Sequence, residues 1–336
     1  MKYAVLEALR RRDEPASLSA LAEELSLREK EVRDAVEALR REGYRVEAQA
    51  DAGLRLAGWQ DRLIPYEIRR GLATRVIGSE VRVLERTPST NDVAWSEALA
   101  GAPEGTAIFA EEQTAGRGRM GRTWHSPRGA SLLLSVILRP TLEANQSNLL
   151  TVASSVAVAQ ALRENLHVQA RIRWPNDITI KGRKVAGILV EGRTLATGAV
   201  FVLGIGLNVN MTPAQIPPDL REIATSLSIE LGQPVSRVEV ARWLLQSLDR
   251  WHRDLSFGDY GRIARCWRRL SSTMGERVTL IESGREYRGR VLDLSLEDGL
   301  IVRLDEGVTR IFHPSTVTMR QPHEGMTKPG EMTKHE

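Results

Sequence analysis

Cysteine is nearly absent from this chain, and long apolar runs are absent altogether. The single cysteine, Cys266, excludes a disulfide within the chain and leaves a cysteine-ligated metal site without partners. No apolar run reaches the roughly 18–20 residues that a membrane span needs. Residues 1–7 carry neither a long apolar stretch nor a small-residue cleavage site, which predicts that no secretory signal is present. These features together predict a cytoplasmic protein with no membrane partner.

What the chain does contain is ordinary for a globular protein. Its 336 residues are 42% apolar and 27% charged, enough to bury a core, and this length predicts two or three domains. The net charge of +4 permits contact with nucleic acid or phosphate but is too small to establish either. No internal repeat is present.

Residues 1–60 carry the pattern of a winged helix-turn-helix. Apolar residues at helical spacing predict helices around residues 5–9, 18–25 and 32–39, and strand-like segments at 44–47 and 54–56 flank a turn at 51–53. Ser26 and Glu29 match a capping box, which predicts Ser26 as the N-cap of the third helix. Gly43 is suited to end that helix.

The charges of this segment are mixed. Residues 1–58 carry a net charge of −1, and the basic residues of the third helix share their exposed face with Asp34 and Glu37. A DNA-binding module needs cations where phosphates lie, which an unfavourable overall balance does not forbid. The predicted DNA contacts are Arg28, Lys30, Arg33 and Arg40. The alternative is a winged helix that serves protein contacts or regulation.

Beyond residue 60 the pattern changes twice. Residues 79–265 alternate strand-like stretches, such as the apolar run 130–138, with helix-like stretches, such as 237–256. Residues 272–320 show short strands separated by glycine-containing turns, which predict a small β-barrel. The polar residues 321–336 predict a disordered tail.

The most informative motif is an arginine- and glycine-rich stretch at 116–122. Its three glycines allow positive φ and close backbone approach, and Arg117, Arg119 and Arg122 supply fixed positive charge. No carboxylate interrupts residues 113–128, so the loop suits a phosphate or a polyphosphate leaving group. It lacks the Gly-Lys-Ser/Thr ending of a Walker loop. The alternative is a flexible, solvated loop.

Four weaker motifs accompany it. Asn176 and Asp177 follow Trp-Pro at the end of a predicted strand, and Lys184 stands at the entrance of a buried strand. Residues 204–210 are rich in glycine and asparagine, and residues 87–92 precede a helical run. Each has a plain structural alternative: a turn, a solvated flank, a glycine-rich strand end and an N-cap.

Taken together and in this order, these motifs resemble the biotin–protein ligases, in particular the bifunctional ligases that also repress the biotin operon. The resemblance implies an α+β chain of three domains with a tail: a winged helix-turn-helix at 1–60, a mixed-sheet α/β catalytic domain at 61–270, an SH3-like β-barrel at 271–320, and the tail at 321–336. It implies that biotin and ATP-Mg²⁺ form biotinoyl-5′-AMP, which acylates one lysine of a biotin carboxyl carrier domain. It also implies operator DNA and a ligand-induced homodimer.

The resemblance also implies roles for individual residues. Lys184, Arg119 and Asp177 are the implied catalytic residues, and no metal-ligating residue is implied. The biotin contacts are Ser89, Thr90, Asn91, Gln113, Arg117, Arg119 and Lys184. The adenylate contacts are Arg122, Trp124, Asn176, Gly206, Leu207 and Asn208. Arg173 stands where many relatives have lysine, and no chemical role is assigned to it.

Two alternatives remain open at this point. A lipoate–protein ligase shares the catalytic fold and the adenylate chemistry, although the Arg/Gly loop and the flanking domains favour biotin. A biotin-sensing transcription factor without catalysis would bind biotin or its adenylate and transfer nothing. The presence of both Lys184 and Asp177 argues against the sensor.

Overall fold

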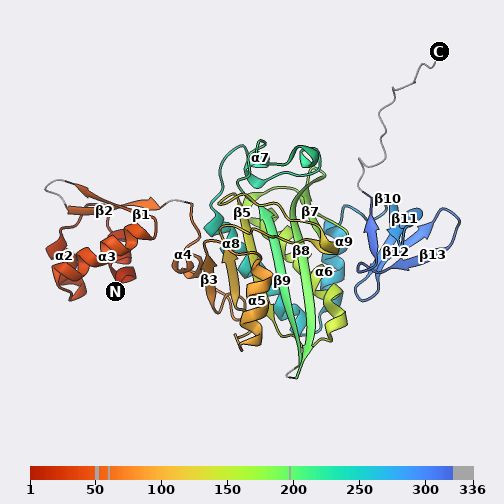
Figure 1. The fold of residues 1–336 in the computed structure, drawn as a ribbon, viewed down its shortest axis with the longest axis horizontal. Coiled ribbons are helices and arrows are strands. Elements are labelled where there is room, and N and C mark those ends of the chain that lie inside the picture. Colours follow the sequence, from red (N-terminus) through yellow and green to blue (C-terminus); the bar gives the residue numbers. More distant parts are fainter. Residues whose placement is uncertain (50–52, 60, 197, 321–336) are drawn as a thin grey trace, which may run out of the picture.

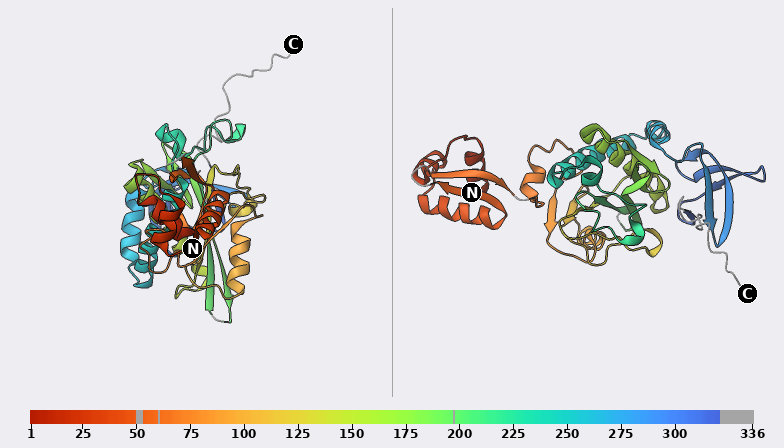
Figure 2. Two further views of the ribbon diagram at one scale, coloured as in Figure 1. Left: turned by 90° about the vertical axis from the view of Figure 1, so that its left-hand side faces the viewer. Right: turned by 90° about the horizontal axis from the view of Figure 1, so that it is seen from above.

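The computed structural model describes residues 1–49, 53–59, 61–196 and 198–320, which form three units in a row (Figure 1). A small helical unit with a two-stranded sheet lies at one end, a seven-stranded sheet with its helices in the middle, and a five-stranded sheet at the other end. Seen from above in Figure 2, the units keep this order along the long axis. No helix within the described ranges is long and apolar enough to cross a membrane.

The N-terminal unit contains all of the predicted helices and strands. Its elements are α1 (Lys2–Arg10), α2 (Leu18–Leu25), α3 (Glu29–Arg41), β1 (Tyr44–Gln49) and β2 (Gly53–Trp59), with β1 and β2 antiparallel. Leu6, Leu21 and Leu39, which set the helical spacing, are fully buried in a core that the unit does not share with the central sheet. Residues 51 and 52 of the predicted turn, and the predicted tail at 321–336, lie outside the described residues.

The start of α3 differs from the prediction. Ser26 is the C-cap of α2 and has a left-handed conformation with φ 54°, so it cannot also open the next helix. Arg28 takes the N-cap position, and its backbone N–H donates to Glu31 Oε2 at 2.8 Å. The capping glutamate is therefore Glu31 rather than Glu29. The prediction of Ser26 as N-cap was wrong because the turn between the two helices uses that residue.

The central unit is built on a mixed sheet. Its strands are β3 (Val81–Leu84), β4 (Ala107–Ala110), β5 (Ser131–Leu138), β6 (Ala170–Arg173), β7 (Asp177–Ile180), β8 (Arg183–Leu195) and β9 (Gly198–Asn208). They lie in the order β3-β4-β5-β9-β8-β7-β6. β3 and β4 pair in parallel, and all the other pairs are antiparallel. The predicted mixed sheet is confirmed.

Helices cover the two faces of this sheet. The helical elements of the region are α4 (Pro65–Arg69), α5 (Thr90–Leu99), η1 (Arg119–Gly121), η2 (Ala144–Gln146), α6 (Ser147–Leu166), η3 (Pro218–Leu220), α7 (Leu227–Leu231), α8 (Arg237–Ser256) and α9 (Tyr260–Leu270). Alternate residues of β5, such as Leu134 and Val136, share a core with α6 and α8. Ile137 points to the opposite face, where it packs with Ala94 and Trp95 of α5. Because of this alternation, the part of the α5 face that the helix does not cover can carry small and polar residues.

The C-terminal unit is an antiparallel sheet. Its strands are β10 (Arg277–Glu282), β11 (Arg285–Ser295), β12 (Gly299–Leu304), β13 (Thr309–Phe312) and β14 (Val317–Met319), in the order β13-β12-β11-β10-β14. The sequence predicts a barrel here. Within residues 271–320, all of which the structure describes, the sheet does not close, because β13 and β14 form its two edges.

A buried carboxylate joins the N-terminal unit to the central one. Glu67 of α4 is fully buried, and it accepts from Arg10 Nη2 at 2.6 Å and from the Tyr44 hydroxyl at 2.7 Å. Arg242 of α8 donates to the backbone carbonyl of Glu67 at 2.8 Å. Burial, followed by the hydrogen bond to Glu67, raises the pKa of the Tyr44 hydroxyl, which stays a neutral donor. Groups from both units thus converge on one residue.

We expect Gly105→Ala to destabilise the protein more than Gly101→Ala. Both glycines have positive φ, so an alanine costs about 1–2 kcal/mol of backbone strain at either position. A Cβ at Gly105 would lie 1.9 Å from the Val76 carbonyl oxygen, whereas nothing lies within 4 Å of one at Gly101. Urea denaturation should show an additional loss of about 1–3 kcal/mol for Gly105→Ala. Equal losses in the two variants would contradict the close contact.

Candidate functional site

One large cavity lies where several strand ends of the central sheet meet the C-terminal unit. Its volume is about 1010 Å³. The cations that line it are Arg117, Arg119, Arg122, Arg173, Lys184, Arg277, Arg288 and Arg320, and the carboxylates are Asp177 and Glu276. Such an excess of positive charge in a concave site favours an anionic ligand.

A buried polar network forms one end of the cavity, at the start of α5. Gln113 Oε1 accepts from the Thr90 backbone N–H at 2.7 Å and from its hydroxyl at 2.8 Å. Ser135 of β5 donates to the Thr90 hydroxyl at 2.7 Å or to Asn91 Oδ1 at 2.6 Å. Asn91 also donates to Glu191 Oε2 at 2.6 Å. These bonds hold a row of donors and acceptors in fixed positions, as recognition of a polar ring would require.

A glycine makes room for this network. A Cβ at Gly204 would lie 2.4 Å from Asn91 Oδ1, so a larger residue there would displace the Asn91 amide from this network. Ser89, predicted with Thr90 and Asn91, is the N-cap of α5 and is buried beside them. The sequence prediction missed Ser135 and Glu191. Ser131 and Ser135 are separated by four residues in an apolar strand, which puts both on one face and could have revealed the polar side.

The Arg/Gly loop folds back on itself as a hairpin-like turn. Gly118 donates to the Arg122 carbonyl at 2.7 Å, and Trp124 donates to the Gly116 carbonyl at 2.9 Å. Arg117 leaves the loop to form a forked pair with Asp92, at 2.7 and 2.8 Å. These hydrogen bonds and the charge of Arg117 lower the pKa of the Asp92 carboxyl. The loop is therefore attached to α5, next to the polar network.

Arg119 turns toward the C-terminal unit. Its guanidinium donates to the carbonyl of Pro314 and, at 3.4 Å, to Asn176 Oδ1. Burial, together with the positive charge of Arg122, lowers the pKa of Arg119, while Asp177 opposes that shift. Asn176 in turn bonds Ile188 of β8 through its side chain and backbone. Arg119 thus spans two units at the mouth of the cavity.

Trp124 lies on a floor of two glycines. Gly187 of β8 and Gly206 of β9 are register partners. A Cβ would lie 3.0 Å from the indole at Gly187 and 2.4 Å from it at Gly206. The indole N–H is buried and has no hydrogen-bond partner among the described residues. Only glycines allow a flat group to lie this close to the sheet.

An ion triad stands beside this floor. Asp177, the first residue of β7, lies 2.6 Å from Lys184 Nζ and 3.1 Å from Arg173 Nη2. Burial would raise the pKa of the Asp177 carboxyl, but the charges of Lys184 and Arg173 outweigh burial and lower that pKa. Asp177 is therefore anionic at neutral pH. Arg173, which received no role from the sequence, is a direct partner of Asp177.

The cavity brings the predicted residues together with one exception. It is lined by Ser89, Thr90, Asn91, Gln113, Arg117, Arg119, Arg122, Trp124, Asn176, Asp177, Lys184, Gly206 and Asn208. Leu207 points the other way and is fully buried in the hydrophobic core, because successive residues of a strand face opposite sides. Asn208 donates to the Thr225 carbonyl at 3.0 Å and keeps a buried Oδ1 without a partner among the described residues.

Known proteins of one kind resemble this chain. The profile of the family described as "Biotin/lipoate A/B protein ligase family" matches residues 83–210. The bifunctional ligase/repressor BirA of Bacillus subtilis is 36% identical over 278 residues, covering 82% of this chain and 86% of that protein. A biotin--[acetyl-CoA-carboxylase] ligase of Mycobacterium tuberculosis is 34% identical over 248 residues, covering 70% of this chain and 89% of that protein.

The fold agrees with the sequence relatives. A biotin protein ligase of Aquifex aeolicus, solved in complex with biotin and ATP, superposes with a TM-score of 0.63 at 26% identity. The match covers 72% of this chain and 99% of that one. With relatives of at least 34% identity matched over most of their length, the chain belongs to the biotin/lipoate A/B protein ligase family, in its biotin–protein ligase branch.

Proposed function

We propose that this chain activates biotin with ATP and transfers it to one lysine of a biotin carboxyl carrier domain. The observation that carries the proposal is the single cavity in which the polar start of α5, the Arg/Gly loop, Lys184 and Asp177 meet. One relative is named a biotin--[acetyl-CoA-carboxylase] ligase, and the solved relative is in complex with biotin and ATP.

The chemistry needs no protein nucleophile. In the first step a carboxylate oxygen of biotin attacks the α-phosphorus of ATP, the bond to the β-phosphate breaks, and pyrophosphate leaves. In the second step the amine of the carrier lysine attacks the acyl carbon, AMP leaves with the bonding electrons, and the amine loses a proton. Charge builds on phosphate oxygens in both steps, so positioned cations are the main requirement.

The cavity supplies separate places for the parts of the adenylate. Ser89, Thr90, Asn91 and Gln113 would bond the polar ring of biotin, and Arg117 closes that end. Lys184 would contact the biotin carboxylate and the α-phosphate, with Arg119 and Arg122 on the phosphate side. Trp124, Asn176, Gly206 and Asn208 would hold the adenine, whereas Leu207 can contribute its backbone alone because its side chain is in the core.

Asp177 suits the second step. An anionic carboxylate in the cavity attracts the ammonium form of the incoming lysine and can accept its proton as the amine attacks. Its lowered pKa makes it a weak base, so attraction and orientation of the lysine are its main contribution. Arg173 would keep hold of the carboxylate until the lysine arrives, after Lys184 has turned to the adenylate.

Mg²⁺ would enter with the nucleotide. It prefers oxygen ligands and usually binds through substrate phosphates together with waters. Of the two carboxylates lining the cavity, Asp177 already bonds two cations. The phosphates of ATP would therefore provide most of the coordination, and the ion would neutralise charge on the leaving pyrophosphate.

We also propose that the chain represses transcription in response to biotin. Its relative in Bacillus subtilis is named a bifunctional ligase/repressor. The N-terminal unit, a winged helix-turn-helix in this proposal, presents Arg28, Lys30 and Arg33 as exposed cations for operator DNA. Arg40 is a weaker candidate, because it bonds the Val46 carbonyl at 2.9 and 2.7 Å and Glu37 at 2.6 Å.

Dimerisation on ligand binding would supply the affinity that a mixed-charge module lacks. The Arg/Gly loop is exposed over most of residues 117–123, so a ligand that orders it changes the surface available to a second copy. In this proposal residues 1–60 bind DNA, residues 61–270 catalyse, and residues 271–320 form an SH3-like unit beside the cavity. The protein acts in the cytoplasm, where the carrier and the operator are found.

We expect labelled biotin to appear on a purified biotin carboxyl carrier domain when the chain, ATP and Mg²⁺ are all present. The reason is that the cavity combines the biotin end, the phosphate cations and the lysine-directed carboxylate. Omitting ATP or the carrier is the control. Adenylate held without transfer would favour a biotin sensor, and labelling by lipoate in place of biotin would favour a lipoate ligase.

We expect Lys184→Met and Asp177→Asn to affect different steps. Lys184→Met should lower adenylate formation, measured as pyrophosphate release, by roughly 10²–10³-fold, because a cation at the developing charge is lost. Asp177→Asn should lower transfer from preformed adenylate by roughly 10²-fold and affect adenylation less. Lys181→Met, an exposed lysine three residues before Lys184, is the matched control. Equal losses in both steps for both variants would contradict these roles.

We expect Gly116→Ala and Arg33→Ala to separate dimerisation from DNA binding. A Cβ at Gly116 would lie 2.8 Å from the Trp124 carbonyl oxygen, so this variant should lose dimers formed with biotin and ATP, measured by sedimentation. Arg33→Ala should keep the dimer and lower the salt slope of DNA binding by about one per half-site. Gly261→Ala, on α9, is the control for the first variant. Ligand-dependent dimers in Gly116→Ala would count against the loop as the switch.

A further inference from the structure

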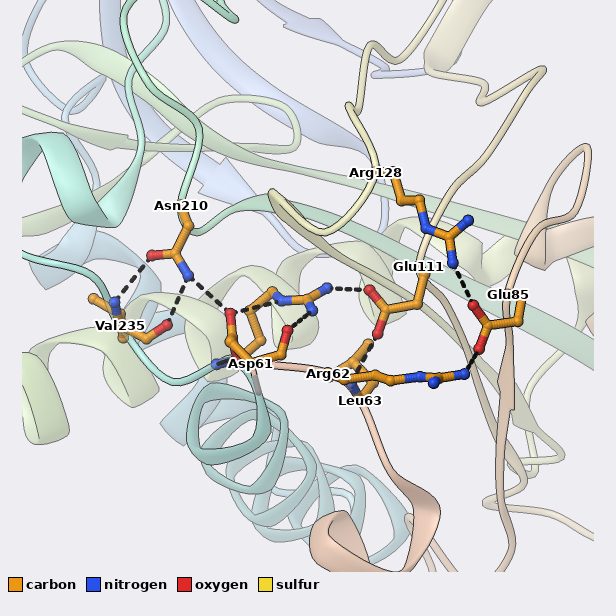
Figure 3. Close-up of polar contacts among 9 residues, drawn as sticks. Asp61, Arg62, Leu63, Glu85, Glu111, Arg128, Asn210 and Val235 are labelled. Carbon is orange, nitrogen blue, oxygen red and sulfur yellow. Dashed lines mark hydrogen bonds and ion pairs between the residues drawn. The ribbon is translucent and has the colours of Figure 1, made fainter. Parts of the chain in front are cut away.

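The linker, here residues 61–64, lies between the N-terminal unit and α4 and is bound to a buried arginine of the central unit. Arg237, the first residue of α8, is 1% exposed. Its Nε donates to Asp61 Oδ2 at 3.0 Å, its backbone N–H donates to Asp61 Oδ1 at 3.1 Å, and its Nη2 donates to the Asp61 carbonyl. Figure 3 shows that Asp61 lies between Asn210 on one side and Glu111 on the other, with Arg62 and Leu63 on the Glu111 side.

The same arginine also bonds Glu111, which lies two residues before the cavity-lining Gln113. Arg237 Nη1 donates to Glu111 Oε2 at 2.6 Å, and Glu111 Oε1 accepts from the Leu63 backbone N–H at 2.8 Å. Asn210 donates to Asp61 Oδ2 at 3.0 Å and to the Val235 carbonyl at 2.9 Å. Linker, strand ends and α8 therefore share one set of charges (Figure 3).

A second ion group strengthens this attachment. Glu85 bonds Arg62 of the linker and, at 2.5 Å, Arg128 (Figure 3). Arg128 is largely exposed and Arg62 is partly exposed, so this group contributes less than the buried one.

Each attachment point is a short step along the chain from a ligand-facing residue. Glu111 directly follows β4 and precedes Gln113 by two residues, while Asn210 follows Asn208 of β9 by two. The two segments also meet at the start of β5: Gly129 donates to the Glu111 carbonyl at 3.1 Å, and Asn210 donates to the Ala130 carbonyl at 2.7 Å. The linker is thus fixed at the ends of β4 and β9 and at the start of β5, close to the cavity.

The buried guanidinium of Arg237 is expected to stay between the carboxylates of Asp61 and Glu111. Removing one partner of such a pair leaves an uncompensated charge, which is strongly destabilising. A movement of Glu111 or Asn210 on ligand binding would therefore change the environment of Asp61, and a movement of Asp61 would act back on both. Coupling of this kind is reciprocal by thermodynamic necessity.

We propose that Arg237, held between Asp61 and Glu111, is a positioning residue that couples the linker of the N-terminal unit to the walls of the biotin and adenylate cavity. This inference rests on the proposed function only for the identity of the ligand. In this proposal, ligand binding affects the N-terminal unit within a single copy of the chain, without the need for a dimer.

The test compares the full-length chain with its Asp61→Asn variant by hydrogen exchange and by biotin titration. Asp61 is 38% exposed at its side chain, so the substitution leaves the core intact. In the ligand-free variant we expect amide exchange to rise by about tenfold or more at Gly129 and Asn210, beside the cavity, as well as at Leu63. Biotin affinity should fall by about fivefold or more. Asp293→Asn, an exposed ion pair with Arg268 away from the cavity, is the matched control.

The exchange and titration results show whether Arg237 couples the linker to the cavity or only holds the linker in place. Faster exchange at Leu63 alone, with Gly129, Asn210 and biotin affinity unchanged, would overturn the proposal. A second variant, Arg237→Lys, keeps the charge for Glu111 and loses the forked contact to Asp61, so it should reproduce the exchange pattern of Asp61→Asn. If the wild-type chain binds no biotin, the proposed function fails, and the ligand-free exchange pattern still decides the coupling.

Discussion

The antiparallel register of β5, β9 and β8 is the constraint on which the site depends. It sets Gly206 opposite Gly187 and Ser135 opposite Gly204, so small and polar residues gather on the face that carries α5. The alternate residues of the same strands, such as Leu203 and Ile205, form the core with α6 and α8. A shift of one residue would exchange the two faces, burying the glycines and exposing the apolar row. The same strand register therefore determines both the hydrophobic core and the cavity floor.

The two faces of the sheet differ in charge. The core side of the sheet is apolar, whereas the cavity side is rimmed by arginines and by Lys184, with Asp177 among them. Asp177 neutralises part of this charge in the ligand-free chain and keeps Lys184 oriented toward the glycine floor. An anionic ligand can replace Asp177 as the partner of Lys184, and Asp177 keeps Arg173 as its own partner. The ion triad thus keeps the site ready for a phosphate while satisfying its own charges.

The sequence predicts elements well where the apolar spacing is regular. The predicted helices at 18–25 and 237–256 coincide with α2 and α8, because each carries an unbroken apolar stripe. β7 was missed because it begins at Asp177 and resembles the turn of its Trp-Pro-Asn-Asp segment. α9 was missed although Ile263, Trp267 and Leu270 recur at helical spacing, since arginines surround them. Short or strongly charged elements give weak periodic signals even when their buried residues are correctly spaced.

The motifs of the site could be predicted from the sequence, but the contacts between their side chains could not. All but one of the residues that the resemblance named line the cavity; the exception is Leu207, because successive residues of a strand face opposite sides and only the backbone geometry shows which of them face the cavity. The pairing of Arg173 with Asp177 depends on the tight turn between β6 and β7, and the role of Ser135 depends on the register with β9. Partners brought together by tertiary structure leave no local pattern for sequence reasoning to detect.

The weak charge of the N-terminal unit is consistent with a ligand-controlled repressor. A module that bound DNA tightly as a single copy would occupy its operator whether or not the cavity held a ligand, because a ligand shifts an equilibrium only by its differential affinity. With Asp34 and Glu37 beside Lys30 and Arg33, each copy is expected to bind weakly. In the proposed repressor, two copies joined by the ligand would combine their contacts, and the effective concentration of the second module would supply the missing affinity. In the proposed repressor, the acidic residues of α3 would keep a single copy weakly bound, so that DNA occupancy would depend on the ligand-bound dimer.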